Sequence, residues 1–313
     1  MSEMSDRLLR GYQAQEKRFV ERRFPLHFQP ENPVIRELYS QSKGLRWNPV
    51  KDIAWNRLDP AAYDVPVREA ARLVWSRRAW GVYPGLGEST SLLLRFCLES
   101  GAAGMDAKLL LSFRPAEEAK HLEACFLFAD RLGGYEAEPG HDIARASNHP
   151  FAQMALDADV PLEAFVAALG CLDDQLDLNL TLSHLQQSHD EVARQVLRLM
   201  AGDKQRHVLF AWALLADRLP RLAPERRPAV AVAVRDMLEG VILAGYRNSW
   251  LLPAGAGERL LAAEALVAER GLGASTVEQE QAVVRATLAQ VRERLATWDI
   301  VLPHVTHPAL GSE

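Results

Sequence analysis

Apolar residues recur at helical spacing in four long stretches of the chain, residues 64–101, 108–133, 159–187 and 188–220. The stretches begin or end at helix boundary signals: Asp64-Val65-Pro66, Gly133-Gly134, and a capping box at Ser188-His189-Asp190-Glu191. Alternation of apolar and polar residues with period two is short and rare, so we expect no strands. The pattern therefore predicts an all-α protein built on a four-helix bundle.

The other segments are arranged around this bundle. Residues 1–60, a polar helix at residues 5–23 followed by repeated prolines, form an N-terminal lead-in, and residues 61–220 form the bundle. Within the bundle, residues 134–158 are the long crossover that lets the second pair of helices return antiparallel. We expect residues 221–302 to add helices that pad the bundle or make a homodimer face, and residues 303–313 to form a flexible tail.

Composition narrows the classes of function. The 313-residue chain has a net charge of −5 and no basic block with interleaved aromatic residues, so we expect neither nucleic acid nor an anionic membrane as a partner. No apolar run approaches the length of a membrane span or of a signal-peptide core. Cys97, Cys125 and Cys171 lie in apolar helical contexts, which favours core thiols over disulfides or zinc ligands. These features predict a cytoplasmic protein.

A sequence pattern that occurs twice contains candidate metal-binding residues. Glu117-Glu118-Ala119-Lys120-His121 in the second helical stretch is matched by Asp203-Lys204-Gln205-Arg206-His207 in the fourth, and both are followed by Ala-Asp-Arg-Leu. Residues three apart project from one face of a helix, so Glu118 and His121 can hold one divalent metal between them. Glu88 precedes Glu118 by thirty residues and Asp174 precedes Lys204 by thirty, as expected for two helical hairpins that each offer an acid opposite the paired residues.

This constellation resembles the ferritin-like di-metal carboxylate proteins, which include soluble di-iron oxygenases, and the resemblance covers roughly residues 66–219. It implies a ferritin-like four-helix bundle with extra N- and C-terminal helices. The residues that match metal-ligand positions are Glu88, Glu118, His121, Asp174 and His207. Glu117 and Asp203 match the acids that orient the histidine of the opposite half. The sixth ligand of the family is a Glu, and this chain has Lys204 there.

The sequence leaves two features of the site undecided: which acid of the third helix binds metal, and the role of Lys204. Asp174 has the symmetric spacing among the third-helix acids, but Asp173 and Asp177 lie next to it or one turn along. Lys204 allows three interpretations: Asp203 replaces it as a metal ligand, its ammonium replaces the second metal ion, or it acts on substrate as a catalytic amine.

The resemblance also implies a function. Iron is the expected metal, as two ions or one, with manganese as an alternative and dioxygen as co-substrate. The predicted activity is that of an oxygenase or oxidase acting on a small organic molecule, and an oxygenase would also need an electron-donor protein. The alternative is a non-catalytic ferritin-like protein that binds metal or serves as a scaffold, with Lys204 marking a degraded site.

Overall fold

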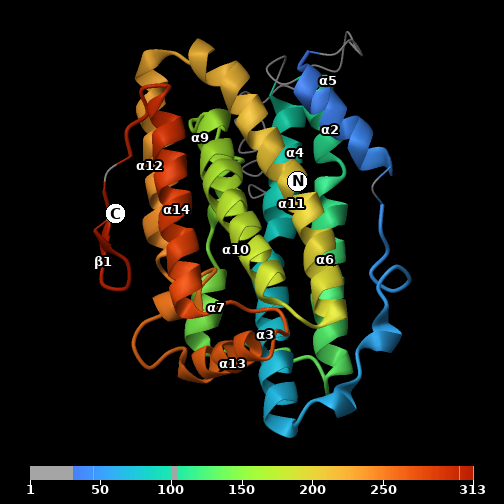
Figure 1. Ribbon diagram of the computed structural model, residues 1–313. Helices are drawn as coiled ribbons and strands as arrows, with labels where there is room; N and C mark the ends of the chain where they lie inside the picture. Colours follow the sequence, from blue (N-terminus) through green and yellow to red (C-terminus); the bar gives the residue numbers. More distant parts are fainter. Residues whose placement is uncertain (1–30, 45, 100–103, 303, 313) are drawn as a thin grey trace, which may run out of the picture.

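The computed structural model describes residues 31–44, 46–99, 104–302 and 304–312, so the polar helix expected at residues 5–23 lies outside the described part of the chain. Long helices run side by side and make up the body of the molecule (Figure 1), which confirms the all-α prediction. In chain order these helices are α3 (Val65–Val82), α4 (Pro84–Leu98), α5 (Met105–Leu111), α6 (Arg114–Arg131), α9 (Leu162–Val166), α10 (Asp174–Gln187) and α11 (Glu191–Arg218).

Three of the four rods of the bundle are interrupted. α4 follows α3 with only Tyr83 between them, and because Tyr83 keeps helical angles (φ −54°, ψ −44°) the chain bends here rather than turning back. A new helix, α6, likewise begins at Arg114 after α5, with Pro115 in its first turn. In the third rod a π-helix, η3 (Ala167–Asp173), joins α9 to α10. All three interruptions lie close in sequence to the predicted ligands. π-Helices such as η3 often occur at functional sites.

The fourth rod, α11, is a continuous helix of 28 residues. It begins at Glu191, and the carboxylate of Asp190 caps it by accepting a hydrogen bond of 2.7 Å from the Ala193 N–H. The capping box predicted from Ser188 is therefore wrong by two residues. The Ser188 hydroxyl instead donates to the carbonyl of His184 at the end of α10.

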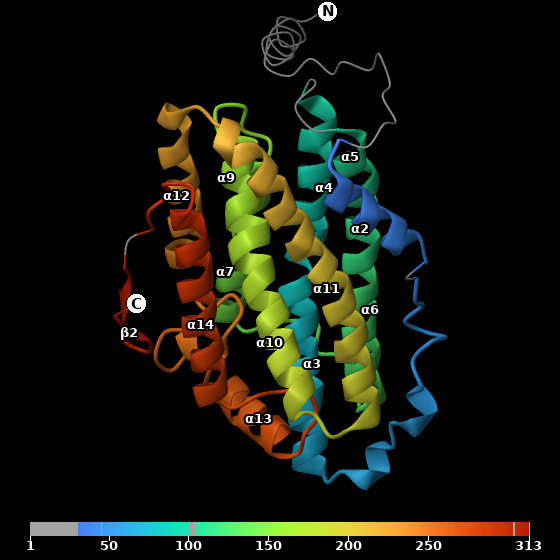
Figure 2. The ribbon, with the colours of Figure 1, turned by 45° about the horizontal axis from the view of Figure 1, so that its top comes forward.

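The C-terminal segment pads the bundle. α12 (Arg227–Met237) packs on α9 and η3, α14 (Val277–Ala296) packs on α10, and α13 (Glu258–Glu269) packs on α3. Figure 2 shows α12 and α14 along the α9–α10 side of the molecule. A second π-helix, η6 (Leu238–Ile242), follows α12. The role of this segment as a homodimer face stays a prediction.

The buried side chains form two apolar clusters, one centred on the α9–α10 rod with α12 and α14, the other on α3 and α6 with α13. In the second cluster Trp75 stacks on Phe128 with ring centroids 4.0 Å apart, and its indole N–H donates to the Leu272 carbonyl at 2.9 Å. Because a buried indole N–H needs a partner, this bond fixes the loop after α13 against α3. The polar site described below lies between the rods.

Shorter elements cover the ends and sides. They are α2 (Pro33–Gly44), α7 (His141–Ser147), α8 (Phe151–Met154), η1 (Trp55–Arg57), η2 (Pro60–Ala62), η4 (Leu219–Arg221), η5 (Pro224–Arg226) and η7 (Ser249–Leu251). Among the described helices, none combines the length and the apolar character needed to cross a membrane.

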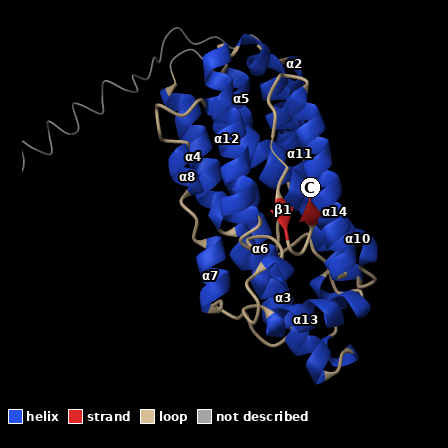
Figure 3. Ribbon diagram, turned by 90° about the vertical axis from the view of Figure 1, so that its left-hand side faces the viewer, coloured by secondary structure: helices blue, strands red, loops and turns tan. Residues whose placement is uncertain are grey.

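The tail differs from the expectation of an unstructured segment. Strand β1 (Thr306–His307) pairs antiparallel with β2 (Gly311–Ser312), and the hairpin stands against the otherwise helical body in Figure 3. The side chain of Leu310 is buried, and the Ala309 carbonyl accepts a hydrogen bond from Gln281 on α14. One apolar anchor and one side-chain hydrogen bond therefore hold a segment whose sequence contains no strand pattern.

Candidate metal centre

The two repeated motifs face each other across the bundle, from α6 and from α11. Glu118 lies between the two imidazoles: its Oε2 is 3.4 Å from Nδ1 of His121, and its Oε1 is 3.5 Å from Nδ1 of His207. All three side chains are buried. Burial acts to raise the pKa of Glu118, but His121, Lys204 and His207 together hold that pKa well below its usual value. Glu118 is therefore a carboxylate shared by both halves of the site.

The acids that precede the motifs hold the histidines crosswise. Glu117 Oε2 lies 2.7 Å from Nε2 of His207, and Asp203 Oδ2 lies 3.1 Å from Nε2 of His121. Because an ionised carboxylate only accepts hydrogen bonds, each Nε2 carries the proton. The structure thus brings Glu117 and Asp203 to the orienting positions that the resemblance implied for them.

This tautomer leaves the other ring nitrogen of each histidine directed into the bundle. Neither Nδ1 atom, of His121 or of His207, has a hydrogen-bond partner among the residues that the structure describes. Both are buried, and an unpartnered buried polar atom costs about 1–3 kcal/mol. Two lone pairs that converge on one carboxylate are a donor arrangement typical of a metal site.

Asp203 does not face this convergence point. Its Oδ2 accepts a hydrogen bond of 2.9 Å from the Trp47 indole and lies 3.3 Å from Lys120 Nζ, while its Oδ1 is paired with Arg206. Burial acts to raise the pKa of Asp203, but His121 and these neighbours hold that pKa below its usual value. Both oxygens of Asp203 thus have partners on the outer side of His121, an arrangement that favours a role in orienting His121, and the interpretation in which Asp203 replaces Lys204 as a ligand stays a prediction.

Each acid of the third rod is paired with a cation. Arg114 contacts both carboxylate oxygens of Asp174 at 2.8 Å, in a bidentate pair that begins one turn before Glu118 on α6. Arg247 Nε and Nη2 donate to the two oxygens of Asp173, at 2.9 and 2.5 Å. Asp174 thus lies in the site, as its spacing predicted, but Arg114 already neutralises its charge.

Lys204 points inward, and its ammonium is paired with Oδ2 of Asp177. Burial acts to lower the pKa of Lys204, but Asp177 and Glu118 together raise that pKa above its usual value. Burial also opposes ionisation of Asp177, yet Arg247 and Lys204 lower its pKa to about 2. This pairing favours the ammonium form of Lys204 over a free amine, and its role as a catalytic residue stays a prediction.

Glu88, on α4, is buried and more loosely held. Its Oε1 has no hydrogen-bond partner within the described ranges, and the nearest base is His149, whose Nε2 is 3.7 Å away. Burial and the charges of Asp173 and Asp174 raise the pKa of Glu88 to about 8. One turn earlier on α4, a Cβ on Gly85 would stand 3.2 Å from the Glu118 carboxylate, so α4 approaches α6 closely at this level.

The charges of the cluster do not balance without a further cation. Seven carboxylates meet five Lys and Arg side chains, namely Glu88, Glu117, Glu118, Asp173, Asp174, Asp177 and Asp203 against Lys120, Lys204, Arg114, Arg206 and Arg247. Glu88, with a pKa of about 8, is mainly protonated at neutral pH, so with neutral imidazoles the buried excess is one negative charge. With Glu88 ionised beside a bound metal the excess would be two, which one divalent ion would neutralise.

The side chains therefore leave free donors for one metal ion. Glu118, His121 and His207 supply the free donors, and Glu88 lies on the neighbouring helix. No group of three or more His, Cys, Asp or Glu side chains is already assembled around a common metal position anywhere in the described residues. A second position is not offered, because Arg114, Arg247 and Lys204 neutralise the third-rod acids that would hold it.

Sequence reasoning missed four residues of this centre. Arg114 and Arg247 were not predicted to pair with the third-rod acids, Trp47 was not predicted to contact the site, and His149 was placed only in the crossover. Arg114 carried a detectable signal, since it lies four residues before Glu118 and therefore on the same face of the helix. The other three come from connecting segments, where no periodicity places a side chain.

No protein-family model matches the sequence, and a search of curated proteins found no match.

Structure comparison finds solved proteins with a similar fold. An R2-like ligand-binding oxidase with an aerobically reconstituted metal cofactor, after photoconversion, matches with a TM-score of 0.65 and 14% identity over 85% of this chain and 94% of that one. Two single-residue variants of an R2-like ligand-binding oxidase with an aerobically reconstituted Mn/Fe cofactor match with TM-scores of 0.63 and 0.62, again at 14% identity. These matches cover 85% and 88% of this chain and 93% and 95% of the variants. The chain therefore has the ferritin-like helical fold of the R2-like ligand-binding oxidases.

Proposed function

We propose that this protein is a metal-dependent oxidase or oxygenase that uses dioxygen on a small organic substrate. One iron or manganese ion would be held by Glu118, His121 and His207, with Glu88 beside them. The observation that carries the proposal is the pair of buried Nδ1 atoms, unpartnered among the described residues and both directed at Glu118. The R2-like ligand-binding oxidases that share the fold contain a reconstituted Mn/Fe cofactor, which supports the same choice of metals.

A bound iron or manganese ion would supply redox chemistry with dioxygen, and its carboxylate and imidazole donors suit either metal. Glu117 and Asp203 fix the tautomer and the ring orientation of the two histidines. Lys204 holds a positive charge next to Glu118 where the family has a metal ligand, so the ammonium replaces a second dication. The two apolar clusters exclude water around the centre.

A cavity that reaches Glu88 would admit substrate to one side of the centre. A cavity of about 600 Å³ is lined by Glu88 and by residues of α3, α4, α6 and the crossover. Its walls are mainly aromatic and small apolar side chains, which is typical of a pocket for a small organic molecule. Glu88 thus lines this cavity from α4, the helix that approaches the Glu118 carboxylate at Gly85.

Metal analysis of anaerobically purified protein tests the proposal, with Glu118→Ala as the site variant and Glu123→Ala as its matched control. Glu123 lies on the same helix but is exposed. We expect about one iron or manganese ion per chain in the wild type and in Glu123→Ala, and loss of the metal in Glu118→Ala. Metal retained in Glu118→Ala would remove the site, and two ions per chain would refute the role given to Lys204.

A non-catalytic metal-binding or scaffold protein is the second candidate. It is favoured by the pairing of Asp174, Asp173 and Asp177 with Arg114, Arg247 and Lys204, respectively. Oxygen consumption separates the two candidates. After reduction and exposure to air, the loaded wild type should consume dioxygen in proportion to its metal content if it is an oxidase or oxygenase. A protein that binds one metal and consumes no dioxygen would be the scaffold.

A further inference from the structure

The cavity beside Glu88 has a polar end and an apolar body. Its lining includes Trp80, Tyr83 and Tyr135, and otherwise mostly alanine, proline and leucine side chains. Trp80 uses its indole N–H to bind the Glu136 carbonyl at 3.0 Å, so it offers the cavity an aromatic surface without a free donor. At about 600 Å³ the space is large enough for a compound of one or two aromatic rings.

The polar end includes Glu88 and His149, and Ser147 and Asn148 also line it. The His149 side chain is 6% exposed and that of Glu88 is 2% exposed. Within the described parts of the chain, neither ring nitrogen of His149 has a hydrogen-bond partner, and neither has Glu88 Oε1. The imidazole packs edge-on against the Tyr246 ring, with centroids 4.7 Å apart, which holds it in place. Two buried polar groups thus face each other without a partner.

The gap between them has the size of one hydroxyl group. His149 Nε2 and Glu88 Oε1 are 3.7 Å apart, which is too long for a direct hydrogen bond. An oxygen atom placed beside the pair can lie within about 2.8 Å of each. An imidazole offers a donor and an acceptor, a carboxyl group offers acceptors, and a hydroxyl group complements both.

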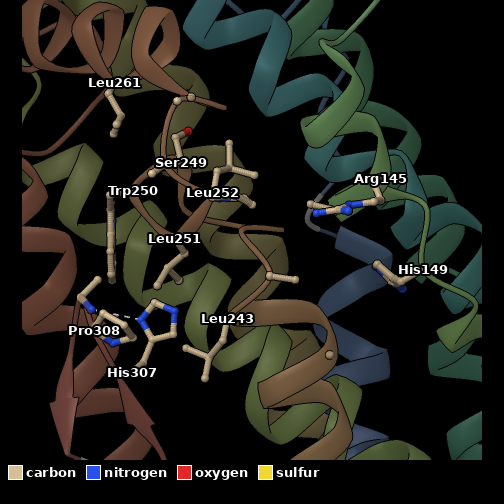
Figure 4. Close-up of a pocket in the computed structure, with 18 of the residues that line it drawn as sticks. Arg145, His149, Leu243, Ser249, Trp250, Leu251, Leu252, Leu261, His307 and Pro308 are labelled. Carbon is tan, nitrogen blue, oxygen red and sulfur yellow. Dashed lines mark hydrogen bonds between the residues drawn. The ribbon is translucent and has the colours of Figure 1, made fainter.

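A second and wider cleft lies on the far side of His149. It has a volume of about 950 Å³, and Figure 4 shows His149 and Arg145 on one wall with Trp250, Leu251 and His307 on the other. His149 lines both the smaller cavity and the wider cleft. Of the residues described here, Glu88 lines the smaller cavity and not the cleft, so only the smaller cavity presents both polar groups.

We propose that the smaller cavity binds a phenol or aromatic alcohol, with its hydroxyl group between His149 and Glu88 and its ring against Trp80 and Tyr83. This inference deepens the proposed function, because it names the substrate class of the same centre and makes His149 a substrate-binding residue. It does not require a bound metal, since the contacts come from the chain itself.

Binding of 2-naphthol and of naphthalene, two probes that differ by one hydroxyl group, tests the inference. Isothermal titration on the protein as purified, and again after chelation, should show 2-naphthol binding about fivefold more tightly than naphthalene, as one added hydrogen-bonded group implies. In His149→Phe the preference should vanish while naphthalene binds as before. His149→Gln, which keeps a donor and an acceptor, should retain part of it, and His141→Phe, at an exposed position on α7, should leave it unchanged.

Two further variants identify the space. Ala137 is exposed and lines the smaller cavity, so Ala137→Trp should weaken both probes. Ala254 lines the wider cleft, and Ala254→Trp should change neither. Equal affinity for the two probes in the wild type, an unchanged preference in folded His149→Phe, or sensitivity only to Ala254→Trp would overturn the inference. The metal content of His149→Phe, measured in parallel, separates this failure from failure of the metal site.

Discussion

Lys204→Met is the substitution that most directly tests how the centre is balanced. It keeps the length of the side chain and removes its charge. Lys204 and Asp177 are buried partners, with side chains 5% and 19% exposed. Removing one member of a buried ion pair typically costs about 3–5 kcal/mol, because the other charge is left uncompensated.

The structure places the expected loss below that range. Asp177 keeps a second cation, since Arg247 Nη1 lies 3.0 Å from its Oδ2. The methionine also avoids the desolvation cost of the buried ammonium. Against this, Glu118 loses one of the charges that hold its pKa low. We therefore expect the free energy of unfolding of the metal-free protein to fall by about 2–3 kcal/mol.

Urea unfolding in the presence of a chelator measures this difference, with Lys51→Met as the control because Lys51 is exposed. The control should change stability by less than about 0.5 kcal/mol. Repeating the unfolding with Mn²⁺ should narrow the gap between wild type and Lys204→Met, because a dication can replace the lost charge beside Glu118. A loss no larger than that of Lys51→Met, or a gap that Mn²⁺ leaves unchanged, would refute the view that Lys204 stands in for a metal ion.

Three further predictions follow from single contacts. Gly85→Ala should weaken metal binding, measured by chelator competition, because its Cβ would lie 3.2 Å from the Glu118 carboxylate. The Cβ of the control, Gly87→Ala, would meet nothing within 4 Å, so this variant should only stabilise the helix, by about 0.5–1 kcal/mol. Asp203→Asn should weaken metal binding about 10–100-fold while the protein stays folded by circular dichroism, as expected for a group that orients a ligand. Burial and Glu280 raise the pKa of Glu264 to about 8. The contribution of Glu264 to the free energy of unfolding is therefore fully present below about pH 4.5 and is lost as the pH rises through 8. Urea unfolding over that pH range should show a smaller loss of stability in Glu264→Gln than in the wild type.

The sequence was sufficient to predict the helices and the inward face of the motifs because both depend on local periodicity. Glu118 and His121 share a face by spacing alone, and the repeat in α11 supplied the opposite half. The crosswise partners of the histidines could also be anticipated, since an acid precedes each motif. What spacing cannot give is the direction of a side chain within its face: Asp203 and His207 are four residues apart, yet Asp203 turns outward to His121 and Trp47.

The unpredicted parts of the site come from long-range pairing. Arg247 meets Asp173 across 74 residues of sequence, and His149 reaches Glu88 from a loop. No helical period relates either pair, so only the packing of the C-terminal segment and of the crossover on the bundle brings them together. The tail hairpin has the same origin, because the burial of Leu310 and not strand propensity holds it.

The two halves of the repeat have therefore taken different roles, and this limits the chemistry. The first half contributes Glu88, Glu118 and His121, none of which is bound to a Lys or Arg side chain in the described hydrogen bonds and ion pairs. The second half contributes His207 together with acids whose charges are matched by fixed cations. An ammonium supplies charge but cannot change oxidation state, so a centre balanced by Lys204 would hold one redox-active ion. Reduction of dioxygen by more than the few electrons that one ion supplies would then need electrons from the substrate or from a donor protein.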